Sequence, residues 1–186
     1  MLTIEQVALW SNVYGGLVSA ASVLIAVVIF LITLFLQRNR RIRGQIGILK
    51  SLMCELNYLG GQGEMNVAGH VRRSHLYWYE KSFETGGVPT HDMKDINVNT
   101  YITELDEEVK GKSTRDLKNI VLWIHDCVIM VNGWTGEFLK LHSADYPSQI
   151  KAQEVEKMLP FVKQPIDFLK TLIPAATKEI DTKWLN

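Results

Sequence analysis

The sequence predicts an all-α protein in which a single N-terminal transmembrane helix continues into a cytosolic helical bundle. Two observations support this prediction. An uncharged apolar run lies at residues 17–36, and the apolar residues that follow recur at helical spacing, without strand-like alternation of useful length. We therefore expect two parts: residues 1–44, with the span and a basic juxtamembrane collar, and residues 45–186, a cytosolic α-helical bundle domain.

The run at residues 17–36 is long enough to cross a bilayer, because a helix of about 20 residues covers the hydrocarbon core. The alternative is a cleaved signal peptide, which needs a basic region before the apolar run, whereas the only charge before residue 38 is Glu5. The basic cluster instead follows the run, at Arg38, Arg40, Arg41 and Arg43. By the positive-inside rule, this cluster predicts a single-pass protein of the inner (cytoplasmic) membrane, with its N-terminus outside and its C-terminal domain cytoplasmic. The same arginines are expected to contact anionic headgroups of the lipid bilayer.

Small and hydroxylated residues form a row along the predicted span. Their near-heptad spacing places them on one face: Ser11, Gly15, Ser19, Ser22, Ala26, Thr33 and Gln37. Because small residues let helices approach closely in lipid, the row predicts a homo-oligomer. It fits either a dry helix contact or the lining of a water-filled pore. Chance is the remaining alternative, since a hydroxyl can bond to the carbonyl four residues back in its own helix.

Helical spacing continues beyond the span. The first helix is expected to begin at a capping-box-like segment, residues 3–6, and to run to about residue 59 with an a/d row of Ile46, Leu49, Met53 and Leu56. A second helix is expected over residues 67–83. A third, acidic helix is expected over residues 100–109, with Ile102, Leu105 and Val109 directed inward.

The most strongly patterned helix is expected to begin at Ser113, which forms a capping box with Asp116. Its inward face should place it at the centre of the bundle. The residues of that face are Leu117, Val121, Ile124, Val128, Val131 and Phe138. The last helical region, residues 147–185, is interrupted by Pro160, Pro165 and Pro174, which predict kinked or separate pieces.

Neither the net charge nor the two cysteines indicate a particular reaction. The net charge is zero overall but +5 over residues 38–81, where eight basic and three acidic residues occur. Cys54 and Cys127 are far apart on the cytoplasmic side and are expected to be reduced core thiols.

We expect no enzymatic activity, no metal and no cofactor. His70 and His75 are five residues apart, which places them on different faces of a helix and makes them poor co-ligands for zinc. No phosphate-binding glycine loop, nucleophile elbow or cysteine–histidine motif occurs. His125 is interpreted as a hydrogen-bonded core histidine rather than a catalytic base.

One segment, HVRRSHLYWYEK at residues 70–81, combines cations with aromatic side chains. Such a mixture can bind phosphates and stack on bases, so it predicts a site for a nucleotide or oligonucleotide. The residues assigned to ligand binding are Arg72, Arg73, His75, Tyr77, Trp78 and Lys81. The alternative is that the aromatic residues pack in the core while the cations face water.

An N-terminal span, a basic collar and a helical cytosolic domain of this size resemble the small membrane-anchored effectors of bacterial phage-defence systems. That resemblance concerns the architecture and implies an oligomeric channel or membrane-disrupting effector, whose cytosolic domain senses a nucleotide, nucleic-acid or protein signal. It assigns no individual functional residue. The alternative function is a non-enzymatic membrane-tethering scaffold, or an accessory subunit that binds a cytosolic protein partner.

Overall fold

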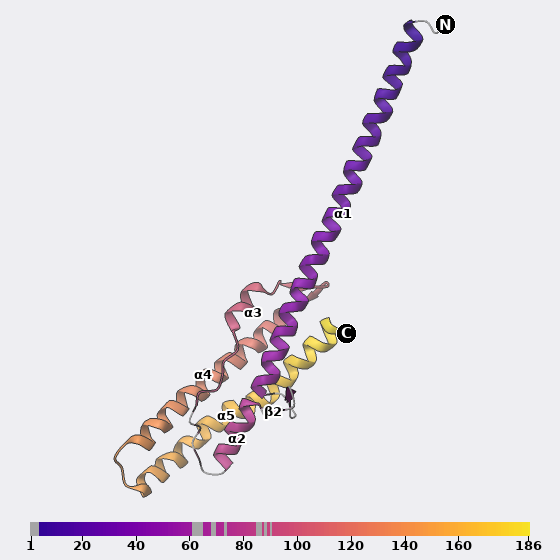
Figure 1. The fold of residues 1–186 in the computed structure, drawn as a ribbon. Helices are drawn as coiled ribbons and strands as arrows, with labels where there is room; N and C mark the ends of the chain where they lie inside the picture. Colours follow the sequence, from indigo (N-terminus) through magenta and orange to yellow (C-terminus); the bar gives the residue numbers. More distant parts are fainter. Residues whose placement is uncertain are drawn as a thin grey trace. The chain divides into compact units, whose positions relative to one another are not determined.

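The computed structural model describes residues 4–60, 65–67, 70–72, 74–84, 87, 89 and 91–186. It is 85% helical, so the predicted all-α class is confirmed. The chain divides into two compact units, Met1–Gly44 and Gln45–Asn186, and helix α1 contributes to both (Figure 1).

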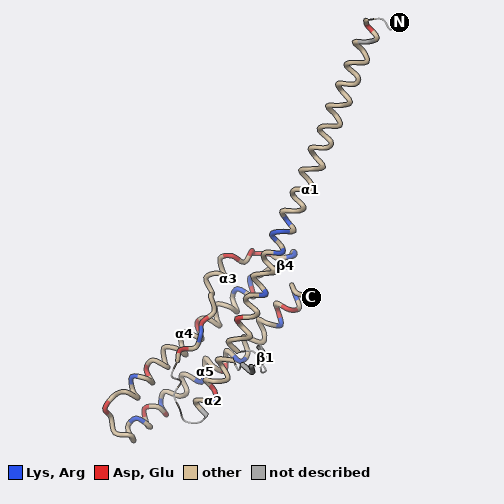
Figure 2. The backbone as a smooth tube through the Cα atoms, in the orientation of Figure 1, with Lys and Arg blue, Asp and Glu red and all other residues tan. Residues whose placement is uncertain are grey.

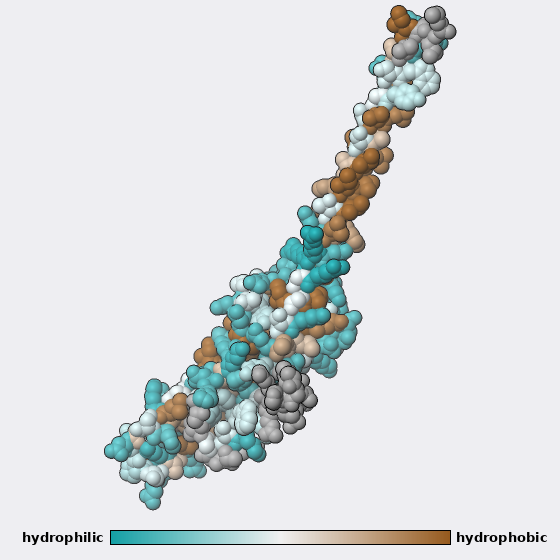
Figure 3. Space-filling model, viewed as in Figure 1, coloured by the Kyte–Doolittle hydropathy of each residue, from teal (hydrophilic) through white to brown (hydrophobic). Residues whose placement is uncertain are grey.

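Helix α1 spans Ile4–Gly60, which agrees with the expected end near residue 59. Thr3, in the expected capping box, lies outside the described residues. In the unit Met1–Gly44, every side chain from residue 8 to residue 38 is exposed. Leu24, for example, is 66% exposed and Phe30 is 61% exposed, and apolar residues cover much of this part of α1 in Figure 3. Among the described residues of this unit, the helix therefore has no buried face from residue 8 to residue 38.

In the unit Gln45–Asn186, α1 packs by one face. Its buried side chains follow a 3–4–3 spacing: Leu49, Leu52, Leu56 and Leu59. Ile46 and Met53, which were expected in this row, are only partly buried. Two of the four predicted positions therefore lie at the edge of the buried face rather than within it, because the apolar stripe of a helix is wide enough to include neighbouring positions.

The expected helix over residues 67–83 is wrong in its first half. Strand β1 (Met65–Val67) instead pairs antiparallel with β2 (His70–Arg72), and helix α2 covers only His75–Glu84. The Ser74 hydroxyl accepts a hydrogen bond from the Tyr77 backbone N–H at 3.3 Å. This bond satisfies a donor that the first turn of the helix would otherwise leave unpaired, so the helix begins after Ser74.

The acidic helix is also shorter than expected. Helix α3 covers Val98–Glu104, and an antiparallel pair of short strands follows, β3 (Glu108–Val109) and β4 (Lys112–Ser113). Lys110 and Gly111 between these strands have φ angles of 53° and 73°, the left-handed conformation of a tight hairpin turn. Leu105 and Val109 are buried as expected, but they belong to the loop and the hairpin rather than to a helix.

Helix α4 covers Arg115–Ser143, and all six residues of its predicted inward face are buried. The capping box at Ser113 is wrong: Thr114 is the N-cap residue and makes no side-chain capping bond. The Thr114 hydroxyl is buried and instead donates to the Asp106 carbonyl at 2.5 Å. A tertiary bond to the preceding loop thus replaces the expected local one.

Helix α5 covers Ser148–Ile180 and passes without a break through Pro160, Pro165 and Pro174, so the expected separate pieces are wrong. A short π-helix, η1 (Asp181–Leu185), follows directly. Helix α5 packs side by side with α4 over much of its length (Figure 1), and Val162, Leu169 and Ala176 are fully buried. Packing of this kind can offset the backbone hydrogen bonds that proline removes.

Candidate functional site

The predicted small-residue row lies on the part of α1 that has no packed face. All seven residues are exposed: Ser11, Gly15, Ser19, Ser22, Ala26, Thr33 and Gln37. The Ser22 hydroxyl donates to the Val18 carbonyl at 2.8 Å, and the Thr33 hydroxyl donates to the Ile29 carbonyl at 2.8 Å. These two hydroxyls therefore need no partner in another helix. What the row offers to a neighbouring helix is mainly its small volume.

The basic residues of the collar follow the uncharged stretch of α1, as the blue segments in Figure 2 show. Their side chains are exposed in the structure: Arg38, Arg40, Arg41 and Arg43. Trp10 and Tyr14, at the other end of the uncharged stretch, are 55% and 61% exposed, and their ring centroids are 5.9 Å apart. Aromatic residues at one end and arginines at the other are typical of helices that cross a membrane.

The predicted ligand site at residues 70–81 is only partly described. Arg73 and the side chain of Arg72 lie outside the described part of the chain. His75, Tyr77, Trp78 and Lys81 all belong to α2. Whether the two arginines join them at one site stays a prediction.

Within α2 the aromatic residues have different environments. Trp78 is 57% exposed, whereas Tyr79 is 4% exposed and its hydroxyl donates to the His91 carbonyl at 2.5 Å. The half-buried Tyr77 contacts Trp78 edge-on, with ring centroids 5.9 Å apart. The core-packing alternative is therefore correct for Tyr79, while Trp78 presents an open aromatic surface.

Sequence reasoning missed two residues beside His75. The His75 ring contacts Tyr58 of α1 edge-on at 4.9 Å between centroids, and the Lys94 ammonium lies 5.4 Å from the Tyr58 ring centroid. Burial, followed by the nearby Lys94 charge, lowers the pKa of His75. No local pattern could have revealed this cluster, because Tyr58, His75 and Lys94 come from three separate segments of the chain.

A hollow of about 570 Å³ lies between α2 and α5. Phe83, Leu159, Pro160 and Ile166 provide its apolar surface, and five charged residues complete the lining: Glu80, Glu156, Lys163, Asp167 and Lys170. Lys170 forms ion pairs with both Glu80 and Asp167. The hydrogen bond to Glu80 raises the pKa of Lys170.

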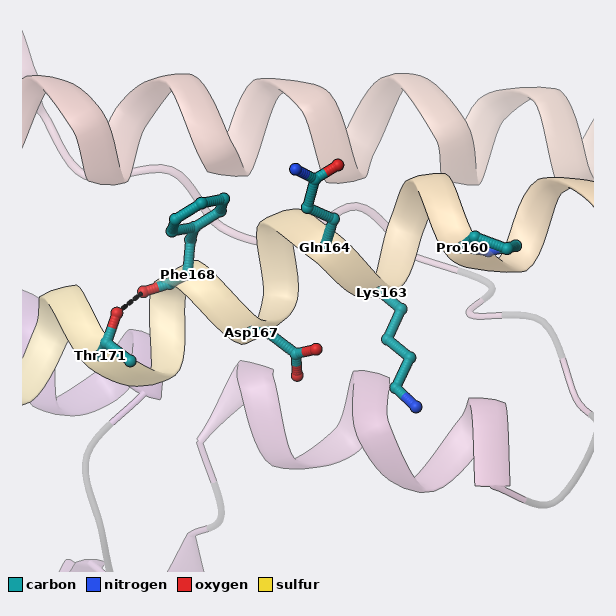
Figure 4. Close-up of a pocket in the computed structure, with 6 residues that line it drawn as sticks. All are labelled: Pro160, Lys163, Gln164, Asp167, Phe168 and Thr171. Carbon is teal, nitrogen blue, oxygen red and sulfur yellow. Dashed lines mark hydrogen bonds between the residues drawn. The ribbon is translucent and has the colours of Figure 1, made fainter.

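A second hollow, of about 490 Å³, lies along α5 and shares Pro160, Lys163 and Asp167 with the first (Figure 4). Lys163 and Asp167 point toward one side of the helix and Gln164 toward the other. The Thr171 hydroxyl donates to the Phe168 carbonyl at 2.8 Å. Both hollows combine apolar and charged side chains of α5.

His125 of α4 contacts Asp95 in the loop before α3. Its Nδ1 lies 2.7 Å from Asp95 Oδ2, although the arrangement at this buried nitrogen is not that of a hydrogen bond. Nearby, Asn132 accepts from the Met93 N–H at 2.6 Å and donates to the Met93 carbonyl at 2.8 Å. His125 and Asn132 therefore hold the loop before α3 against α4.

The two cysteines differ in burial. Cys127 is 7% exposed and lies in the core, where burial, followed by the charge of Asp126, raises the pKa of its thiol. Cys54 is exposed, so the expectation of two core thiols is wrong for this residue. Among the described residues, no three histidine, cysteine or acidic side chains come together as a metal site.

Comparison with models of known protein families, with curated proteins and with solved structures found no match to this chain.

Proposed function

We propose that this protein is a single-pass protein of the inner (cytoplasmic) membrane. The supporting observation is that α1 in the unit Met1–Gly44 presents leucine, isoleucine, valine and phenylalanine on all sides, and its most apolar stretch has no buried residue. The core helix of a soluble protein would bury such a stretch. Each of these side chains gains about 1.5–3 kcal/mol on leaving water, so lipid or another helix is expected to cover them.

The position of the arginine cluster supports an orientation with residues beyond Arg43 in the cytoplasm. Protease added outside intact cells should therefore leave the unit Gln45–Asn186 uncut, whereas protease added after lysis should digest it. Cleavage of this unit in intact cells would reverse the proposed orientation.

The proposed activity is that of an oligomeric channel or membrane-disrupting effector. A lone span needs no face of small residues to anchor a domain, whereas spans that contact one another do benefit from such a face. In the row of α1, Gly15, Ser19, Ser22 and Ala26 follow one another at spacings of 4, 3 and 4 residues. The architectural resemblance to membrane-anchored phage-defence effectors supports the same proposal.

Replacing one alanine within the row and one outside it with leucine tests this activity. Ala26→Leu should reduce the size of the detergent-solubilised complex and the ion flux through liposomes, because the larger side chain separates the facing backbones. Ala20→Leu is the matched control: it is the same substitution, six residues earlier and about 120° away around the helix, outside the row. Equal effects at the two positions would mean that the row is an accident of composition.

The alternative function is a membrane-tethering scaffold or accessory subunit. The bonds of the Ser22 and Thr33 hydroxyls to their own helix favour this alternative, because both hydroxyl protons are already donated within the helix and not to a partner helix. A scaffold predicts no ion flux in liposomes and a span that tolerates Ala26→Leu.

In this proposal the signal is a phosphorylated nucleotide or an oligonucleotide. The exposed Trp78 supports base stacking, and Lys94 adds a cation near His75 that the sequence pattern did not include. Replacing Arg72 and Arg73 together with alanine should remove salt-sensitive binding of cyclic nucleotides or oligonucleotides. Arg115→Ala, at an exposed arginine of α4, serves as the control. Unchanged binding by the double variant would exclude this site.

A further inference from the structure

In the part of the chain that the structure describes, helices α4 and α5 form an antiparallel pair whose neighbours lie on one side only. Among the described residues, α3 contacts α4, α2 contacts α5, and Ile173 of α5 lies against Gly60 of α1. His125 and Asn132 face the loop before α3. The opposite side of the pair carries large apolar side chains that no described residue covers.

These side chains form one patch across both helices. On α4, Trp123 and Met130 are seven residues apart, or about two turns, and are 62% and 50% exposed. On α5, Phe161 and Phe168 have the same spacing and are 56% and 47% exposed. Trp134, one turn after Met130, is half-buried and joins the two rows by stacking on Phe161, with ring centroids 5.3 Å apart and planes 20° apart.

The Trp134–Phe161 stack also sets the register of the pair. Because the helices run antiparallel, the residue seven positions before Trp134 in α4 lies level with the residue seven positions after Phe161 in α5. Cys127 is therefore level with Phe168, which lies between Trp123 and Met130 along the pair. The four exposed side chains thus surround a common centre and form a continuous surface, and none of the patch residues is charged.

We propose that this patch, defined by Trp123, Met130, Trp134, Phe161 and Phe168, binds the same patch of a second copy of the chain. Its composition is that of a protein interface core, in which tryptophan, phenylalanine and methionine are enriched and charges are depleted. Its exposed apolar area is roughly 400–500 Å², the size of the largest patch on a typical monomer and often functional. Two patches face to face remove roughly 900 Å², which is less than the roughly 1,200 Å² of a stable interface between free proteins, so the contact needs copies that are already held together.

This inference rests on the proposed self-association of the span, which supplies the second copy. Chains held together by their spans keep the unit Gln45–Asn186 at an effective concentration of about 1 mM, where an interface of this size forms readily. When a patch binds the same patch of a second copy, the two-fold symmetric pair buries both patches, and neither can bind a third copy.

The test is cross-linking of the full chain in nanodiscs, in a background where the exposed Cys54 is replaced by serine. A short bismaleimide should link Met130→Cys into a covalent dimer, since the inferred symmetry brings this position near its counterpart. The matched control is Ile129→Cys: it is the adjacent residue and is 53% exposed, but it points away from α5. Ile129→Cys should give at least a tenfold lower dimer yield, and the Cys54→Ser background alone should give none.

A second measurement separates this inference from the proposed function. Met130→Lys should lower the cross-linking yield of Phe161→Cys, whereas Ile129→Lys should not. Equal dimer yields at Met130→Cys and Ile129→Cys, or none at either, would overturn the patch as a self-contact even if Ala26→Leu still reduces the complex. A complex that Ala26→Leu leaves unchanged would instead overturn the proposed contact of the spans. Protection of Met130→Cys from alkylation without cross-linking, in nanodiscs containing a single chain, would assign the patch to lipid and overturn the inference.

Discussion

Two parts of helix α1 use apolar residues in opposite ways. Before Gly44, leucines such as Leu24 and Leu31 are 66% and 58% exposed, and apolar side chains occur on every face. After Gln45, the apolar residues occupy one face, and Leu52 and Leu56 are fully buried. Both parts are rich in leucine. The difference shows that the arrangement of apolar residues around a helix, rather than their number, decides whether protein or lipid is expected to cover it.

Truncating one leucine in each part of α1 should give the largest difference in the free energy of unfolding. Leu56→Ala should lower the free energy of unfolding of the unit Gln45–Asn186 by about 2–5 kcal/mol, because it leaves a cavity in the core. Leu24→Ala should change it by less than about 0.5 kcal/mol. Denaturant unfolding in detergent, followed by circular dichroism, measures both. Similar losses for the two variants would mean that the parts of α1 do not differ in packing.

Tryptophan offers a second matched pair. Trp184 is fully buried and its Nε1–H donates to the Val109 carbonyl at 3.1 Å, whereas Trp10 is 55% exposed. Trp184→Phe should lower the free energy of unfolding by about 1–3 kcal/mol, since the buried Val109 carbonyl loses its donor. Trp10→Phe should leave it unchanged. The same denaturation experiment applies, and a tolerated Trp184→Phe would show that water replaces the lost bond.

Two glutamines of α1 test where the packed part of the helix begins. Gln45 is 8% exposed; its amide donates to the Glu104 carbonyl at 2.9 Å and accepts from the Asp106 N–H at 2.8 Å. Gln45→Ala should lower the free energy of unfolding by about 1–2 kcal/mol and increase hydrogen exchange at Asp106. The exposed Gln37 is the control, and Gln37→Ala should alter neither quantity. Unchanged exchange at Asp106 in Gln45→Ala would place the start of the packed region later in α1.

The smallest effect concerns pH. Burial and the Lys94 charge lower the pKa of His75 below its ordinary value of 6.5 in the folded protein, so the unfolded chain binds a proton first as the pH falls. The stability of the unit Gln45–Asn186 should therefore decrease as the pH falls through 6.5 toward the lower folded-state pKa. His75→Gln should reduce this decrease. Unfolding curves recorded at about pH 7.5 and about pH 5.5 would show it. An equal pH dependence in the wild type and the variant would contradict the assignment to His75.

The spacing of apolar residues predicted burial correctly in a long helix with one strong periodicity. The six inward residues of α4 were predicted from spacing, and all are buried, because their row recurs at helical spacing from Leu117 to Phe138. The spacing failed at short elements: Met65–Val67 and His70–Arg72 pair as strands, and Thr114 rather than Ser113 is the N-cap residue of α4. At these places local preferences are weak, and a tertiary contact such as the Thr114–Asp106 bond decides the outcome.

The candidate sites divide in the same way. The row from Ser11 to Gln37 and the arginine collar could be found from the sequence, because all their members belong to one helix whose geometry is known in advance. The cluster of Tyr58, His75 and Lys94 could not, since its three residues are brought together only by folding. The same holds for the patch of Trp123, Met130, Trp134, Phe161 and Phe168.

The sequence by itself determined the all-α class, the uninterrupted first helix and the inward face of α4. Each depends on the periodicity of apolar residues along a single segment, which backbone geometry converts directly into a face. Only the tertiary structure decided that α5 continues through its three prolines, that Cys54 is exposed, and which apolar residues of α4 remain uncovered. The physical reason is that burial depends on which segments meet, and a helix with apolar residues on several sides contains no local signal that says which side its neighbours will cover.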